Sequence, residues 1–181
     1  CNRIKLMQNG IAMDYQQFGV RHMPSADPFL AKKIEVVQGP ASILYGSDAL
    51  GGAINILPME APVHAEHPDG LNATLMGDFQ TNNNQGTGGL NLEGKSGRFG
   101  FAGGVIYRSA GNMTTPDVRS FEDPEGQPND PRFTGELDHT DFEQLNATAT
   151  VSYDAGIGDV HLNYTRWKNE HNFLLPNGKA I

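Results

Sequence analysis

The feature that most constrains the fold is an unbroken two-residue alternation in the last quarter of the chain. From Gln144 to Tyr153, polar residues at even positions alternate with apolar residues at odd positions. Successive side chains of a β-strand point to opposite faces, so this stretch predicts a strand with one polar and one apolar face. Residues 160–165 repeat the alternation, and glycine-diluted versions precede it. We therefore expect five strands, at about 71–80, 86–95, 98–109, 142–154 and 158–169.

The connections between these strands alternate in length. Ser96-Gly97 and Ala155-Gly156-Ile157 are tight turns, whereas residues 111–141 form a connection of roughly 30 residues. Short turns at one edge and long loops at the other are typical of an outer-membrane β-barrel. A soluble β-sandwich also alternates, and the strand pattern alone leaves both architectures open. Aromatic residues placed toward the expected strand ends favour the barrel, namely Tyr107, Tyr153, Tyr164 and Trp167.

The first third of the chain centres on Ile34–Ile56, which reads IEVVQGPASILYGSDALGGAINI. The apolar runs at its two ends predict buried strands. Pro40 suits the first position of a short helical turn over Ala41–Tyr45, and Gly46 can end that turn with a positive φ. Gly51-Gly52 permits a tight bend before the second strand. The stretch thus predicts a strand, a helical turn, a glycine bend and a strand.

Shorter elements are expected on either side. Ile4–Met7 and Ile11–Met13 predict two strands joined by a turn at Asn9-Gly10. Ser25–Lys33 predicts a short helix with a polar cap and Pro28 near its start. The predicted organisation is an α+β domain over 1–62, a linker over 63–70 and the β-strands over 71–181.

Composition limits the partners. The 21 acidic residues outnumber the 13 basic ones, for a net charge of −8, which argues against a nucleic-acid partner. No run of about 18 apolar residues predicts a transmembrane helix, but a membrane-spanning β-strand needs only ~9–11 residues. The single cysteine, Cys1, allows no disulfide within the chain.

Both parts of the chain resemble one known family. Ile34–Ile56 resembles the plug-domain signature of TonB-dependent outer-membrane receptors, Ile-Glu-Val-x-Arg-Gly-Pro-x-Ser-x-x-Tyr-Gly-x-x-Ala-x-Gly-Gly-x-Ile-Asn-Ile. The chain departs from it once, where Gln38 replaces the arginine, so an ion pair through that arginine is in doubt although Glu35 is present. The residues of the structural motif are Glu35, Gly39, Pro40, Gly46, Gly51, Gly52 and Asn55.

The resemblance implies an α+β plug domain followed by antiparallel strands of a large transmembrane β-barrel of ~22 strands. Five strands cannot close such a barrel, so we interpret these residues as an internal piece of a longer receptor. The implied function is TonB-dependent active uptake of a scarce ligand across the bacterial outer membrane. Ferric siderophores are the commonest ligands of the family, and haem, cobalamin and saccharide receptors share the signature.

The resemblance also implies the partners. They are TonB of the TonB–ExbB–ExbD system, the lipid bilayer of the outer membrane and the small-molecule ligand, with no cofactor, no metal and no enzymatic activity. In similar receptors the outward loops of the plug form the floor of the binding site, which places it at Gln16–His22 and the turn after Tyr45. Stacking and anion contacts suit these candidate ligand-binding residues: Gln17, Phe18, Arg21, Tyr45 and Ser47. Phe18 and Tyr45 could instead pack the plug against the barrel wall.

Other chemistries find weaker support. His64 and His67 lie between Pro62 and Pro68, so a helix is not expected to hold them as metal ligands. The acidic residues of 111–141 lack EF-hand spacing, and residues 46–52 lack the Lys-Ser/Thr of a P-loop. Three alternatives stay open: a soluble secreted β-rich binding module, an outer-membrane adhesin or enzyme barrel, and a receptor that also signals through an N-terminal extension.

Overall fold

A computed structural model describes residues 4–13, 27–40, 42–46, 49–64, 67–114, 136–137 and 139–172. The chain divides into two compact units. The first unit comprises Cys1–Ala73, Asn91–Gly104 and Ala147–Arg166, and the second comprises Thr74–Leu90, Val105–Asn146 and Trp167–Ile181.

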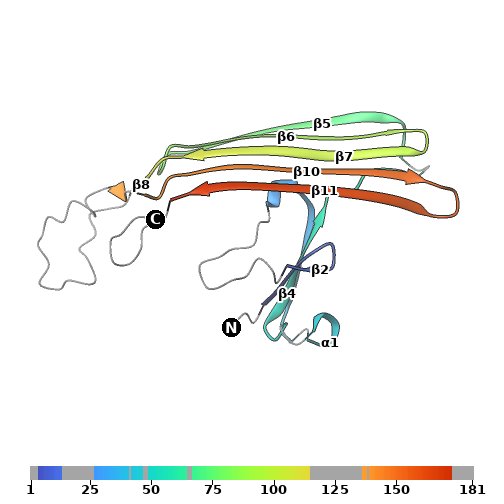
Figure 1. The fold of residues 1–181 in the computed structure, drawn as a ribbon, viewed down its shortest axis with the longest axis horizontal. Coiled ribbons are helices and arrows are strands. Elements are labelled where there is room, and N and C mark those ends of the chain that lie inside the picture. The colour runs from blue at the N-terminus through green and yellow to red at the C-terminus, as the bar shows by residue number, and fades with distance from the viewer. Residues whose placement is uncertain are drawn as a thin grey trace, which may run out of the picture. The chain divides into compact units, whose positions relative to one another are not determined.

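The N-terminal part of the first unit contains a four-stranded sheet in the order β2-β1-β4-β3. Its strands are β1 (Ile4–Gln8), β2 (Ile11–Ala12), β3 (Ala31–Gln38) and β4 (Gly52–Pro58) (Figure 1). β1 and β4 are parallel, whereas β1–β2 and β3–β4 are antiparallel. The β1–β2 turn is the predicted Asn9-Gly10, with φ of 51° and 75°, the left-handed values that a tight hairpin turn requires.

The connection from β3 to β4 has the predicted form. The helical turn α1 spans Ser42–Tyr45, and Gly46 follows it with φ of 93°. The tightest position is Gly52, whose φ is 142°. A Cβ atom there would lie 2.4 Å from the Val37 carbonyl oxygen, so only glycine lets β4 begin so close to β3.

The predicted helix over Ser25–Lys33 is wrong beyond Leu30. The structure has a 3₁₀ turn, η2 (Pro28–Leu30), in which Asp27 accepts a hydrogen bond from the Phe29 backbone N–H. Ala31–Lys33 belong to β3, because β4 continues to Pro58 and offers them backbone partners. A single helical turn gains little by itself, so the sheet takes these residues. Ser25 and Ala26 lie outside the described residues.

Five long strands follow in the order β11-β10-β7-β6-β5, and they are mostly antiparallel (Figure 1). Their ends lie within two residues of the predicted ones, which confirms the strand prediction. Tyr164 is near the middle of its strand rather than toward an end, which corrects that expectation. The strands are β5 (Gly70–Gln80), β6 (Gln85–Ser96), β7 (Phe99–Ala110), β10 (Phe142–Asp154) and β11 (Asp159–His171).

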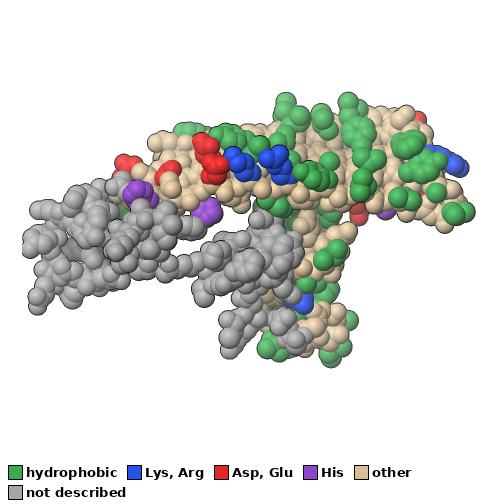
Figure 2. Space-filling model, in the orientation of Figure 1, with side chains coloured by type: hydrophobic (Ala, Val, Ile, Leu, Met, Phe, Trp, Pro, Cys, Tyr) green, Lys and Arg blue, Asp and Glu red, His purple; other side chains and the backbone are tan. Residues whose placement is uncertain are grey.

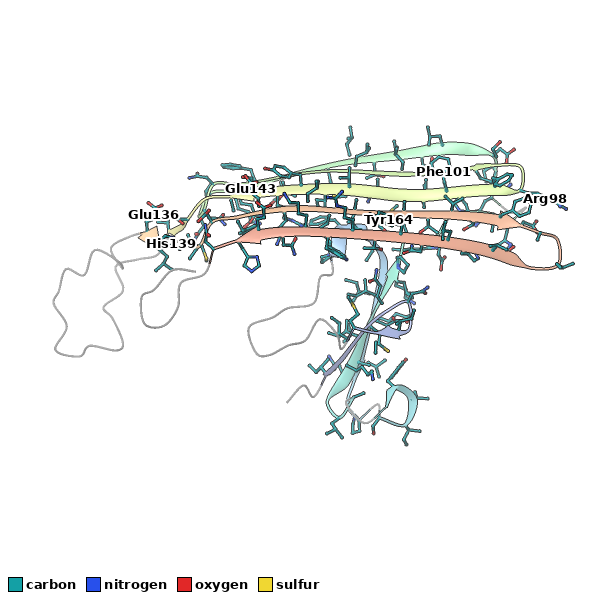
Figure 3. All side chains as sticks on the ribbon, viewed as in Figure 1. Arg98, Phe101, Glu136, His139, Glu143 and Tyr164 are labelled. Carbon is teal, nitrogen blue, oxygen red and sulfur yellow. The ribbon has the colours of Figure 1, made fainter. Side chains whose placement is uncertain are left out.

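The predicted long connection after β7 contains a two-stranded ribbon that the sequence did not reveal. β8 (Met113–Thr114) pairs with β9 (Glu136–Leu137) in the second unit. Thr114 N–H donates to the Asn82 side chain at 3.1 Å, and Met113 N–H donates to Thr140 Oγ1 at 2.8 Å. Figure 3 labels Glu136, which is part of β9, and His139 shortly after it. None of the helices in the described part of the chain has the length and apolar character that crossing a membrane requires.

Candidate functional site

The strand β10 buries its polar face and exposes much of its apolar face. On β10, Thr150 and Ser152 are 6% and 1% exposed, whereas their neighbours Leu145 and Val151 are exposed. On β11, Leu162 is 72% exposed. Figure 2 shows hydrophobic side chains standing out along the long strands. A strand of a soluble sheet has the opposite arrangement, and a strand that faces lipid has this one.

The polar face of β10 and β11 is tied together by side-chain hydrogen bonds within the first unit. Ser152 Oγ and His161 Nδ1 lie 2.6 Å apart, and Asn163 Nδ2 donates to Thr150 Oγ1 at 2.7 Å. Thr165 Oγ1 donates to Asn163 Oδ1 at 3.3 Å. Because the buried hydroxyls of Thr150 and Ser152 both have a partner on β11, these polar side chains can be buried without an apolar neighbour.

The chain between β4 and β5 lies against this face. Thr150 Oγ1 donates to the Met59 carbonyl oxygen at 2.8 Å. The Pro62 carbonyl approaches β7 so closely that a Cβ on Gly100 would lie 2.1 Å from its oxygen. Nearer β5, Asp69 Oδ1 accepts from the Gly97 N–H and from Lys95 Nζ, both at 3.1 Å. These two hydrogen bonds hold the pKa of Asp69 below its usual range.

A second set of contacts joins η2 to the strands. Asn91 Nδ2 on β6 donates to the Phe29 carbonyl at 3.1 Å. Leu30 is buried, and a Cβ on Gly104 would lie 2.9 Å from its Cδ2 atom. Glycines at positions 100 and 104 of β7 therefore let the N-terminal domain approach the strands closely.

A cavity of about 620 Å³ borders these contacts. Its lining includes Lys32, Glu60, His64, His67, Asn91 and His161. A space this large and this polar admits water. Water can replace hydrogen bonds that break, so polar contacts along this boundary can separate at a modest cost in free energy.

The signature residues form a polar link across the four-stranded sheet. Asn55 on β4 accepts from the Gly10 N–H at 2.9 Å and donates to Glu35 Oε2 at 3.3 Å. Glu35 lies opposite Asn55 in the β3–β4 register and also accepts from Lys33 at 2.8 Å. The hydrogen bond from Lys33, with that from Asn55, lowers the pKa of Glu35. Asn55 thus joins the β1–β2 turn to β3, a structural role.

Gln38, which stands where the family has arginine, is exposed at the end of β3 opposite Gly52. Glu35 is held by Lys33 and Asn55. The other motif glycines shape the chain: Gly39 has φ of 92° and donates its N–H to the Gly51 carbonyl at 3.3 Å. Pro40 precedes α1 and is exposed.

The predicted ligand-binding residues fall mostly outside the described residues. Gln17, Phe18, Arg21 and Ser47 lie there, so their contact with a ligand stays a prediction. Tyr45 ends α1 and is half-buried. The residues before it, Ile43 and Leu44, are 98% and 78% exposed. The sequence did not predict that these two apolar residues lie on the surface.

Ser152 and His161 are a hydroxyl–imidazole pair, but their hydrogen bond is one of those that link the side chains of β10 and β11. In the part of the chain that the structure describes, no three His, Cys, Asp or Glu side chains are grouped so as to hold a metal ion.

Comparisons with known proteins agree with this architecture. The family model described as "TonB-dependent Receptor Plug Domain" matches residues 2–53. The rhizobactin receptor of Rhizobium meliloti (strain 1021) is 31% identical over 123 residues, which are 62% of this chain and 16% of that protein. The hemin receptor of Yersinia pestis is 68% identical over 28 residues, 16% of this chain and 4% of that protein.

Solved structures share the fold. The FrpB iron transporter of Neisseria meningitidis matches with a TM-score of 0.70 and 16% identity, over 93% of this chain and 24% of that one. The ferric enterobactin receptor PfeA matches with a TM-score of 0.55 and 12% identity, over 93% of this chain and 26% of that one.

The chain therefore spans about a quarter or less of the length of these relatives. Four observations agree: the Ile34–Ile56 signature, the four-stranded plug sheet, the strands with an apolar outer face and the matches above. Residues 2–53 match the plug domain of TonB-dependent receptors, and the chain as a whole is similar to outer-membrane receptors of that family.

Proposed function

We propose that the protein takes up a ferric siderophore across the bacterial outer membrane, using energy delivered by TonB. The observation that carries the proposal is the inverted face of β10, which is polar toward the plug residue Met59 and apolar on its other side, next to a plug sheet. Relatives described as a rhizobactin receptor, a hemin receptor and an iron transporter support an iron-containing ligand. Haem is the second candidate because of the hemin receptor match.

The proposed division of the chain is a plug over 1–62, a linker over 63–70 and barrel strands over 71–181. The plug closes the lumen of the barrel while the ligand binds on the outer side. Gln17, Phe18, Arg21, Tyr45 and Ser47 are proposed to contact it, with Arg21 pairing with an anionic ligand.

TonB, driven by ExbB and ExbD, pulls the plug from the periplasmic side. The water-accessible boundary beside Asn91 lowers the free-energy cost of such movement, because water replaces the hydrogen bonds that break there. The ligand then passes through the part of the lumen that the moved plug residues leave. Members of the family are transport receptors, and we propose no catalytic step for this chain.

The proposal is tested by uptake of radioactive iron into cells of the source organism with and without the gene. The iron is supplied separately as catecholate siderophore, hydroxamate siderophore, carboxylate siderophore and hemin. We expect one siderophore class to require the gene, and a protonophore to abolish that uptake. If no iron compound depends on the gene, the iron proposal is wrong. If the protein is fully soluble without detergent, the membrane transport proposal is wrong as well.

A further inference from the structure

We infer that Met59–His64 and His67–Asp69 form a fixed anchor segment, which stays docked on the strands while the plug residues before it move. The inference rests on the proposed TonB-driven uptake and goes beyond it, since it states which part of the chain moves and where the movement stops. It follows from the contacts of this segment and from the path that a pull must take through the plug sheet.

The anchor segment is held by four different strands of the first unit. Met59 accepts from Thr150 of β10, and the Pro62 backbone packs on Gly100 of β7. His64 Nε2 lies 3.4 Å from Asp159 Oδ2 of β11. Asp69 is bound by Lys95 of β6 and by the Gly97 N–H of the β6–β7 turn. A force on this segment is therefore shared among several strands.

The contacts are also of different kinds. Ala61 and Val63 are 5% and 3% exposed, so the middle of the segment is fixed by apolar burial. Thr150 is itself fixed, because Asn163 donates to its hydroxyl oxygen and so directs its proton to Met59. The Asp69 contacts include one ionic hydrogen bond, which is stronger than a neutral one. Water that replaces one contact leaves the others in place.

The sheet topology directs a pull into this segment. β1 pairs with β4 in parallel over five positions, from Ile4↔Gly52 to Gln8↔Ile56. A load applied to the chain before β1 passes through these pairs to β4, which ends at Pro58, directly before Met59. Without the anchor the load would reach Gly70 and pull β5 from its end, breaking its hydrogen bonds one at a time. The anchor segment instead takes the load before it reaches the barrel.

The test compares two cross-links in the receptor as the source organism makes it, with Cys1→Ser in every variant. The first pair, Met59→Cys and Thr150→Cys, ties the anchor segment to β10. The second pair, Phe29→Cys and Asn91→Cys, ties η2 to β6, at a contact that the inference says must break. Each pair is bridged by a short bifunctional thiosulfonate and released by reductant. Single-cysteine variants treated in the same way are the controls.

The readout is uptake of radioactive iron, supplied as hemin and as the ferric siderophores of an iron-starved culture. We expect bridging of the second pair to lower uptake by about tenfold or more, reversibly, because the plug cannot move. Bridging of the first pair is expected to leave uptake unchanged. Loss of uptake on bridging the first pair overturns the inference, and so does unchanged uptake with both pairs bridged. If cells with the unmodified receptor take up no iron, the proposed function fails and this inference fails with it.

Discussion

At the residue scale, the glycine and asparagine residues of the signature allow close packing and make hydrogen bonds, in addition to forming turns. Gly52 combines a φ of 142° with a neighbouring carbonyl that leaves no room for a Cβ atom. The side-chain amide of Asn55 accepts a hydrogen bond from the Gly10 N–H through its oxygen and donates one to Glu35 through its nitrogen. The signature is therefore explained by backbone geometry and hydrogen bonding inside the plug, and these residues need not touch a ligand to be indispensable.

Gly52→Ala is expected to destabilise the plug by more than the ~1–3 kcal/mol of backbone strain, because its Cβ also meets the Val37 oxygen. Gly39→Ala is the matched control, with φ of 92° but no atom within 4 Å of the added Cβ. Trypsin digestion of the folded receptor measures plug stability. The expected order of plug cleavage rate is Gly52→Ala, then Gly39→Ala, then the unmodified receptor. Equal rates for the two variants would contradict the close approach of Val37.

The carboxyl group of Glu35 gives a pH prediction. Its pKa in the folded protein is lowered by Lys33 and Asn55, so these interactions stabilise the fold above the pKa of the unfolded chain. That stabilisation is lost as the pH falls through the folded pKa. Asn55→Ala should raise the pKa of Glu35 toward its usual value, as followed by NMR of labelled glutamate. A pKa that does not move would show that Asn55 contributes nothing to the shift.

At the scale of elements, β10 is the strand that links the long strands to the plug. Its alternation is the clearest strand signal in the sequence, and the structure places that strand at Phe142–Asp154, as predicted. Its polar residues are the buried ones, and they bind β11 and the chain after β4. One strand thus joins the barrel wall to the plug, through a hydroxyl at position 150.

Thr150→Val should destabilise the packing of Met59 on β10. It removes the donor to a carbonyl and the acceptor of Asn163, and an unsatisfied buried group costs about 1–3 kcal/mol. Thr148→Val is the control, since the Thr148 hydroxyl makes longer contacts, 3.4 Å to the Tyr164 carbonyl and 3.5 Å to Thr165. Calorimetry of the purified receptor in detergent is expected to show a lower plug transition for Thr150→Val. A larger decrease for Thr148→Val would show that the Met59 contact is unimportant.

At the scale of the whole molecule, we propose that the outward apolar face of the strands meets lipid. Leu162→Arg should therefore lower the amount of assembled receptor, because arginine costs about 2–4 kcal/mol on the lipid face near the bilayer midplane. Leu162→Ala is the control for lost volume. The assembled fraction is measured by the heat-dependent gel mobility of outer-membrane barrels. Equal assembly of both variants would place Leu162 away from lipid.

The sequence by itself determined the five long strands, the helical turn of the signature and the resemblance to the receptor family. It could do so because a two-residue period and glycines with positive φ are local properties that each segment carries in its own residues. The helix predicted over Ser25–Lys33 is wrong beyond Leu30 because the interaction that decides its structure is not local. Whether Ala31–Lys33 join a helix or a strand depends on the length of β4, which lies about 20 residues further along the chain.

Only the tertiary structure decided which face of β10 is buried. The alternation of polar and apolar residues is the same for a soluble sheet and for a membrane barrel, so the period alone cannot distinguish them. The pairing of Thr150 with Met59, of Gly100 with Pro62 and of Asp69 with Gly97 joins segments far apart in the chain. Such contacts are fixed by how packed segments meet in space, and no local pattern in the sequence encodes them.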